Sequence, residues 1–172
     1  MAACSPGGLG ASKNGPYAPG VATRGEAVDG LIVGNRLIEA GEYELALDAF
    51  TRAALEHGMT VDVLSGLGSA NLGLGRLGQA EKLLRRAIET DGALPEAWNN
   101  LGVVLMEKGE VPEAEQVFRR AYALDNGESD AIRDNLRLAL AKSENPGYTG
   151  VQQEDYKLVR RGSSDYVIRS KP

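Results

Sequence analysis

The stretch PEAWNNLGVVLMEKGEVPEAEQVFRRAYALD, residues 95–125, decides the fold because its pattern occurs twice more earlier in the chain. Four of its positions return every 34 residues: Gly34, Gly68 and Gly102; Gly41, Gly75 and Gly109; Ala46, Ala80 and Ala114; and Ala53, Ala87 and Ala121. A fixed period of this length, with helical spacing of the apolar residues, predicts repeated helical units that stack on one another.

Each unit is predicted to contain two helices joined by a turn at its central glycine (Gly41, Gly75 or Gly109), where a left-handed backbone is required. The earlier glycine of each unit lies inside the first helix, where it costs about 1 kcal/mol relative to alanine. We therefore expect a close crossing of the two helices there, with Ala46, Ala80 and Ala114 facing these glycines. Pro95 and Pro112 are expected in the first turns of helices.

The last unit contains W-x-x-L-G at Trp98, Leu101 and Gly102, followed by A-x-x-x-F at Ala114 and Phe118. The first unit repeats A-x-x-x-F at Ala46 and Phe50, and the second has L-x-x-L-G ending at Gly68, with Leu84 in the place of the Phe. These motifs resemble the tetratricopeptide repeat over residues 27–128. The resemblance implies an all-α, right-handed solenoid of three repeats, at 27–60, 61–94 and 95–128.

The stretch SDAIRDNLRLALAKS, residues 129–143, is predicted to be a helix that caps the last repeat, because an open apolar face at the end of the stack must be covered. Its face comprises Ile132, Leu136, Ala139 and Leu140. Its DNL matches the NNL of the last repeat with a shift of one residue, so we interpret it as a degenerate seventh helix. The helical domain is thus predicted to span residues 26–144.

Both ends of the chain differ in composition from this domain. Residues 1–25 are rich in Gly, Pro, Ala and Ser and are predicted to be a flexible tether. Residues 145–172 form a polar tail with two runs rich in Tyr, Val, Leu and Ile, separated by RRGSSD, which indicates strand, turn and strand. Two hypotheses remain open for the tail: it is disordered, or it pairs with the helical stack or with a partner's sheet edge.

The composition indicates no catalytic chemistry. The net charge is −5 without a basic patch, which disfavours nucleic acid as a partner, and one cysteine and one histidine form no zinc-ligand cluster. His57 is expected at a helix end, facing the helix dipole. The glycine-rich GLGSANLGLG (66–75) lacks the strand and the lysine of a phosphate-binding loop. We predict no catalytic residues, no metal, no cofactor and no enzyme activity.

The resemblance implies a concave groove lined by the first helix of each repeat, where a partner protein binds. The predicted groove residues are Asn35, Ile38, Glu39, Asp62, Ser65, Gly66, Ser69, Leu72, Gly73, Glu96, Asn99, Asn100, Val103, Met106 and Glu107. None is Lys or Arg, which disfavours the capture of a chain-terminal carboxylate. Small side chains in the middle repeat would admit a ligand backbone, and Asn99 and Asn100 could bind a peptide main chain.

We therefore predict a mildly acidic groove that holds an extended or helical segment of another protein. The alternative is structural: Gly66 and Gly73 are merely tolerated, and Asn100 caps or braces its own repeat.

The opening MAAC resembles the end of a lipobox, in which the cysteine, here Cys4, becomes lipidated after cleavage. Ser5 is similar to the residue that directs such lipoproteins to the outer membrane, and RDNLRLALA after the last repeat resembles the assembly lipoproteins of tight-adherence (Flp) pili. These resemblances imply an anchor at Cys4, a location on the periplasmic side of the outer membrane, and a secretin or another pilus-assembly component as partner. The alternatives are a cytoplasmic adaptor and a regulatory subunit of an enzyme on another chain.

Overall fold

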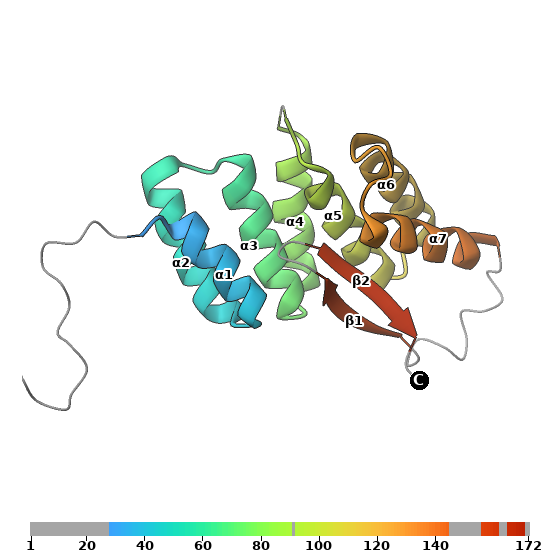
Figure 1. Ribbon diagram of the computed structural model, residues 1–172, viewed down its shortest axis with the longest axis horizontal. Coiled ribbons are helices and arrows are strands. Elements are labelled where there is room, and N and C mark those ends of the chain that lie inside the picture. The colour runs from blue at the N-terminus through green and yellow to red at the C-terminus, as the bar shows by residue number, and fades with distance from the viewer. Residues whose placement is uncertain (1–27, 91, 145–155, 162–164, 171–172) are drawn as a thin grey trace, which may run out of the picture.

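The computed structural model describes residues 28–90, 92–144, 156–161 and 165–170. Within these ranges the chain forms seven helices and two strands (Figure 1). They are α1 (Gly30–Ala40), α2 (Tyr43–His57), α3 (Val61–Gly73), α4 (Leu77–Ile88), α5 (Pro95–Glu107), α6 (Val111–Leu124), α7 (Asp130–Glu144), β1 (Tyr156–Arg161) and β2 (Asp165–Ser170).

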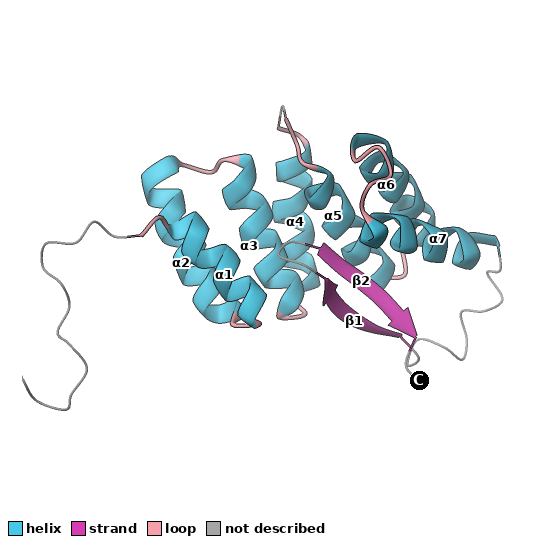
Figure 2. Cartoon of the chain, viewed as in Figure 1, coloured by secondary structure: helices cyan, strands magenta, loops and turns pink. Residues whose placement is uncertain are grey.

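The helices form three pairs and a terminal cap, as the repeat pattern predicts. Each helix packs against the next along the chain, and the first helices of the pairs, α1, α3 and α5, also contact one another. These three helices and α7 therefore line one face, while α2, α4 and α6 form the other layer (Figure 2). The predicted all-α solenoid with its capping helix is confirmed for the described part of the chain.

The turns inside the three pairs share one backbone geometry. Gly41, Gly75 and Gly109 have φ values of 77°, 70° and 80°, in the left-handed region that an L side chain rarely adopts. In each turn the next residue donates its N–H to a carbonyl five residues earlier, for example Glu110 to Leu105 at 2.8 Å. This bond satisfies a free carbonyl at the helix end. The predicted turn glycines are therefore confirmed.

The glycines inside the first helices mark close crossings, also as predicted. A Cβ added to Gly34, Gly68 or Gly102 would lie 2.7, 2.6 or 2.5 Å from the nearest atom of the second helix. Those atoms belong to Phe50, Leu84 and Phe118. The nearest side chains to these glycines thus lie one turn after Ala46, Ala80 and Ala114, and a contact of the alanines with the glycines stays a prediction. The alanines themselves are fully buried.

The two strands form an antiparallel hairpin that lies against the helical stack. Their register pairs Tyr156 with Ser170 and Arg161 with Asp165. β2 contacts both α5 and α7, and Ile168 belongs to the same apolar cluster as Val103, Met106 and Ala139 (Figure 1). The predicted fold class did not include this hairpin. Of the two hypotheses for the tail, the twelve strand residues agree with pairing against the helical stack.

The predicted N-terminal tether, including Cys4, lies outside the described residues. None of the helices described here is long and apolar enough to cross a membrane.

Candidate functional site: a concave face with an open half and an occupied half

An open hollow of about 260 Å³ lies on the N-terminal half of the face formed by α1, α3 and α5. Its lining residues are Asn35, Ile38, Asp62, Ser65, Gly66, Ser69, Leu94, Glu96, Ala97 and Asn100. All of them except Leu94 and Ala97 were expected in the groove. The structure therefore brings the N-terminal part of the predicted groove together in one place.

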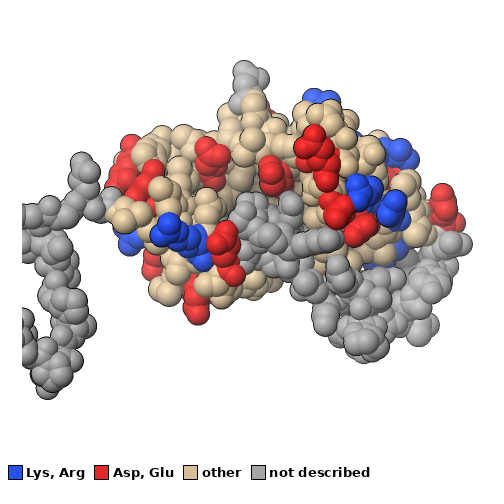
Figure 3. All heavy atoms as spheres, viewed as in Figure 1, with Lys and Arg blue, Asp and Glu red and all other residues tan. Residues whose placement is uncertain are grey.

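The hollow is acidic and contains an unsatisfied polar atom. Asp62 and Glu96 supply carboxylates, and none of the described residues that line it is Lys or Arg. Figure 3 shows Asp and Glu side chains in several groups in this view of the molecule, with groups of Lys and Arg toward both of its ends. The Oγ of Ser65 is buried and has no hydrogen-bond partner among the described residues. Since buried polar atoms are nearly always paired, a polar group of a ligand would compensate this one.

The two groove glycines of α3 are required by packing. A Cβ on Gly66 would collide with the ring of Phe50, and a Cβ on Gly73 would collide with the ring of Tyr43. Both rings come from α2, so these glycines let α2 approach α3 closely. The alternative that they are merely tolerated is wrong, and their absent side chains serve the contact between repeats one and two.

A chain of buried amides crosses the concave face from α3 to α7. Asn100 Nδ2 donates to Ser69 Oγ at 2.9 Å, and Asn99 Nδ2 donates to Asn100 Oδ1 at 3.3 Å. Asn135 Nδ2 donates to Asn99 Oδ1 at 2.9 Å, and the backbone N–H of Ile168 donates to Asn135 Oδ1 at 3.2 Å. In this series each asparagine donates through its Nδ2 toward α3 and accepts through its Oδ1 from the side of α7, so each hydrogen bond fixes the orientation of the next amide.

This chain changes the role expected for Asn99 and Asn100. Asn99 is fully buried, and it joins α5 to α7 through Asn135. Asn100 is 1% exposed at the edge of the hollow and joins α5 to α3 through Ser69. Asn99 therefore does not face an open groove as predicted. The structural alternative, in which Asn100 braces its own repeat, agrees with its bond from Asn99, and Asn100 also braces the neighbouring repeat through Ser69.

The C-terminal half of the predicted groove is occupied by β2. Val103 and Met106 are buried in the cluster that contains Ile168, and Ile168 itself is 8% exposed. Its neighbour Val167 is 3% exposed. The prediction that Val103 and Met106 line an open surface is therefore wrong in this structure, because the chain's own tail covers them.

The remaining predicted groove residues lie at the margins of this face. Leu72 is buried in the same core cluster, and Gly73 packs against Tyr43. Glu39 and Glu107 are exposed near the C-terminal ends of α1 and α5. They add negative charge to the face without lining the hollow.

Sequence reasoning missed three residues of this face: Asn135, Val167 and Ile168. Asn135 had a signal, because the DNL of the capping helix aligns with the NNL of the last repeat and places Asn135 where that repeat has Asn100. Val167 and Ile168 were recognised only as members of an apolar run. Nothing in their spacing indicates which helices the run would contact.

An ion-pair network fixes the second repeat against the third. Glu81 of α4 binds Lys108 at 2.7 Å and Arg85 at 2.8 Å, and Arg85 also binds Glu113 of α6 at 2.8 Å. The hydrogen bond from Lys108, together with that from Arg85, holds the pKa of Glu81 below its ordinary value despite its partial burial. The network thus stabilises the ionised carboxylate between repeats.

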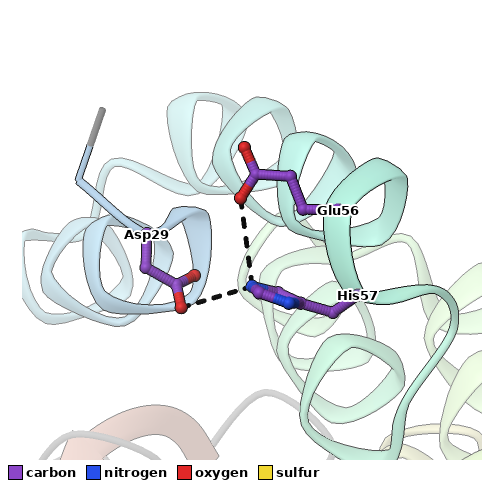
Figure 4. Close-up of side chains that lie close together, drawn as sticks. All are labelled: Asp29, Glu56 and His57. Carbon is purple, nitrogen blue, oxygen red and sulfur yellow. Dashed lines mark ion pairs between the residues drawn. The ribbon is translucent and has the colours of Figure 1, made fainter. Parts of the chain in front are cut away.

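A second cluster, Asp29, Glu56 and His57, lies at the N-terminal end of the solenoid (Figure 4). His57 Nε2 lies 3.3 Å from Asp29 Oδ2 and 3.9 Å from Glu56 Oε2. Asp29 caps α1 by accepting the N–H of Leu31 at 2.8 Å, and this bond is the main cause of its lowered pKa. His57 ends α2 as predicted. These side chains are partly exposed, and the contact of Asp29 with His57 joins the start of α1 to the end of α2.

Comparison with known proteins agrees with this architecture. A family model described as tetratricopeptide repeat matches residues 34–95 and 66–129. No curated protein matches the chain. Among solved structures, the TPR domain of Sgt2 from Aspergillus fumigatus is similar with 23% identity and a TM-score of 0.64, over 69% of this chain and 80% of that one.

Two further similar structures were solved with bound peptides. The second TPR domain of human RPAP3, in complex with the HSP70 peptide SGPTIEEVD, has 25% identity and a TM-score of 0.58, over 66% of this chain and 94% of that one. The second TPR of Spaghetti (RPAP3), bound to the HSP90 peptide SRMEEVD, has 27% identity and a TM-score of 0.53, over 56% of this chain and 84% of that one.

Proposed function

Because the chain belongs to the tetratricopeptide repeat family, whose members are generally non-catalytic interaction modules, we propose that it is an adaptor that holds a segment of a partner protein in its open hollow. The hollow beside Ser65 carries this proposal. It combines an opening of about 260 Å³ with a buried hydroxyl that has no partner in the described structure. A polar group of a bound segment would satisfy that hydroxyl.

The charge of the hollow limits the partner's chemistry. The peptides bound by the two RPAP3 relatives end in the acidic sequence EEVD. In this chain Asp62 and Glu96 line the hollow without a Lys or Arg among the described lining residues, so a negatively charged segment would be repelled. The proposed ligand is therefore a neutral or basic segment that approaches α3 closely beside the small residues Ser65 and Ser69.

A selection of random peptides on the full chain tests this function. Peptides displayed on phage should be enriched for Lys or Arg, and Ser65→Arg should weaken the binding of a selected peptide about tenfold or more by filling the hollow and repelling the peptide's charge. Gln79→Arg is the matched control, because Gln79 is exposed on α4 and the charge change is the same. Equal binding by the wild type and Ser65→Arg would refute this site.

We further propose that the adaptor is an envelope lipoprotein anchored through Cys4 on the periplasmic side of the outer membrane. Support comes from the sequence: MAAC resembles the end of a lipobox, and the Gly/Pro-rich stretch after it resembles a tether between anchor and domain. Metabolic labelling with palmitate should mark the protein expressed from its native gene, and Cys4→Ala should abolish the label. An unlabelled wild-type protein would favour the cytoplasmic alternative.

The partner of such a lipoprotein is proposed to be a secretin or another component of a tight-adherence pilus machine. Support is again from the sequence, through the resemblance of RDNLRLALA (133–141) to the assembly lipoproteins of those systems. Deletion of the gene should abolish surface pili, and the wild-type gene should restore them whereas the Ser65→Arg gene should not. Normal piliation after deletion would contradict this assignment.

A further inference from the structure

We propose that β2 is a built-in strand ligand of the C-terminal half of the concave face, and that a partner strand with an aliphatic residue at the position of Ile168 binds there by displacing it. The proposal deepens the proposed function by adding a second, gated half to the binding face. It concerns α5 and α7, whereas the open hollow lies between α1, α3 and α5, so the two halves can be tested separately.

The contacts of β2 are those of a bound extended segment. Ile168 packs in the apolar cluster that includes Val103 and Met106 of α5 and Ala139 of α7, the two helices that β2 contacts. Successive strand residues point to opposite faces, yet both Val167 and Ile168 are almost completely buried. Of the two, Ile168 is the residue that packs in the cluster of α5 and α7, so an aliphatic side chain at its position is the feature that this half of the face accepts.

The backbone of β2 is recognised by Asn135. The Nδ2 of this residue is committed to Asn99 Oδ1 at 2.9 Å, which aims its Oδ1 at the strand, where it accepts the N–H of Ile168 at 3.2 Å. A main-chain N–H is present in every extended segment without proline, so this contact does not depend on the identity of the strand. Asn135 thus selects for extended backbone, and the apolar cluster selects for the aliphatic side chain at the position of Ile168.

The solenoid has its own terminal cap, which makes β2 dispensable for closing the stack. α7 already packs on α6, and its buried Ala131, Ile132 and Ala139 cover the end of the third repeat. A two-stranded hairpin by itself is marginally stable in water, so β1 and β2 depend on the helices more than the helices depend on them. These relations are those of a displaceable ligand.

A synthetic peptide with the sequence DYVIRS, labelled with a fluorophore, tests the proposal on the full chain. In the wild type, the tethered β2 competes with the peptide. Ile168→Asp removes the competing side chain, so the variant should bind the peptide about tenfold or more tightly than the wild type, measured by fluorescence anisotropy. A DYVDRS peptide should not bind. Leu55→Asp, at a residue 85% exposed on α2, is the matched control and should behave as the wild type.

Native-state hydrogen exchange gives a second, independent readout. The amides of β2 should exchange in the wild type much faster than those of α5, because the hairpin opens while the solenoid stays folded. The proposal is overturned if β2 and α5 exchange at the same rate through global unfolding, if Ile168→Asp loses its helical circular dichroism, or if the folded variant does not bind DYVIRS. Ser65→Arg should leave peptide binding to the Ile168→Asp chain unchanged, which separates a failure here from a failure of the open hollow.

Discussion

Replacing Gly102 by alanine tests the packing that holds each helix pair together. The new Cβ would lie 2.5, 2.7 and 2.8 Å from three ring atoms of Phe118, and that ring is fully buried. Overpacking of a tight core costs about 1–3 kcal/mol, and a ring without free space belongs in the upper part of that range. Alanine regains about 1 kcal/mol of helix propensity. We therefore expect a net loss of about 1–2 kcal/mol.

The matched control is Gly78→Ala on α4, where an added Cβ has no neighbour within 4 Å. There only the backbone gain remains, so we expect a stabilisation of about 0.4–1 kcal/mol. Urea unfolding followed by circular dichroism at 222 nm measures both variants in the full chain. The glycine-to-alanine substitution should thus lower the free energy of unfolding at Gly102 and raise it at Gly78. A stabilised Gly102→Ala variant would refute the argument that this glycine is required by the Phe118 ring.

Three further predictions concern contacts between repeats. Asn135→Leu removes the hydrogen bonds that Asn135 makes with Asn99 Oδ1 and with the Ile168 N–H. We expect a loss of about 1–3 kcal/mol in the free energy of unfolding for each bond whose groups stay buried, measured in urea. An unchanged midpoint would contradict the series of amide hydrogen bonds. Lys108 lowers the pKa of Glu81 in the folded state, so the ionised carboxylate stabilises the fold at pH values above its ordinary pKa of 4.5, and this stabilisation is lost as the pH falls through the lowered pKa. Glu81→Gln should therefore flatten this part of the plot of unfolding free energy against pH. Identical plots for the variant and the wild type would show that the pair contributes nothing. The exposed Glu44–Arg76 pair at 2.6 Å should contribute less than about 1 kcal/mol, so Glu44→Gln should hardly move the urea midpoint.

The sequence predicted the solenoid because its signals are local and repeated. A turn glycine is predicted from the left-handed φ that its own position requires. A glycine that recurs inside a helix at a fixed period indicates a close crossing with another helix. The identity of the facing residue was harder to predict, because it depends on the reach of a side chain. The nearest neighbours of the glycines are Phe50, Leu84 and Phe118, each one turn after the alanine that the repeat pattern indicates.

The candidate site was predicted in its N-terminal half and misjudged in its C-terminal half. Ser65 and Asp62 line an open hollow as the repeat register implies. Val103 and Met106 follow the same register, but a segment more than fifty residues later in the chain covers them. Such a long-range contact leaves no periodic trace in the sequence. For the same reason Asn99 was taken as a ligand-binding residue, although its partner proved to be Asn135 of the capping helix.

Chemical-shift mapping of the isotope-labelled full chain shows directly whether a bound peptide lies in the open hollow. A peptide selected on the wild type is titrated into the protein, and the backbone amides that shift are located. The account predicts the largest shifts at Asp62, Ser65 and Ser69, around the open hollow of the concave face. Shifts confined to α2, α4 and α6, with none around this hollow, would contradict it.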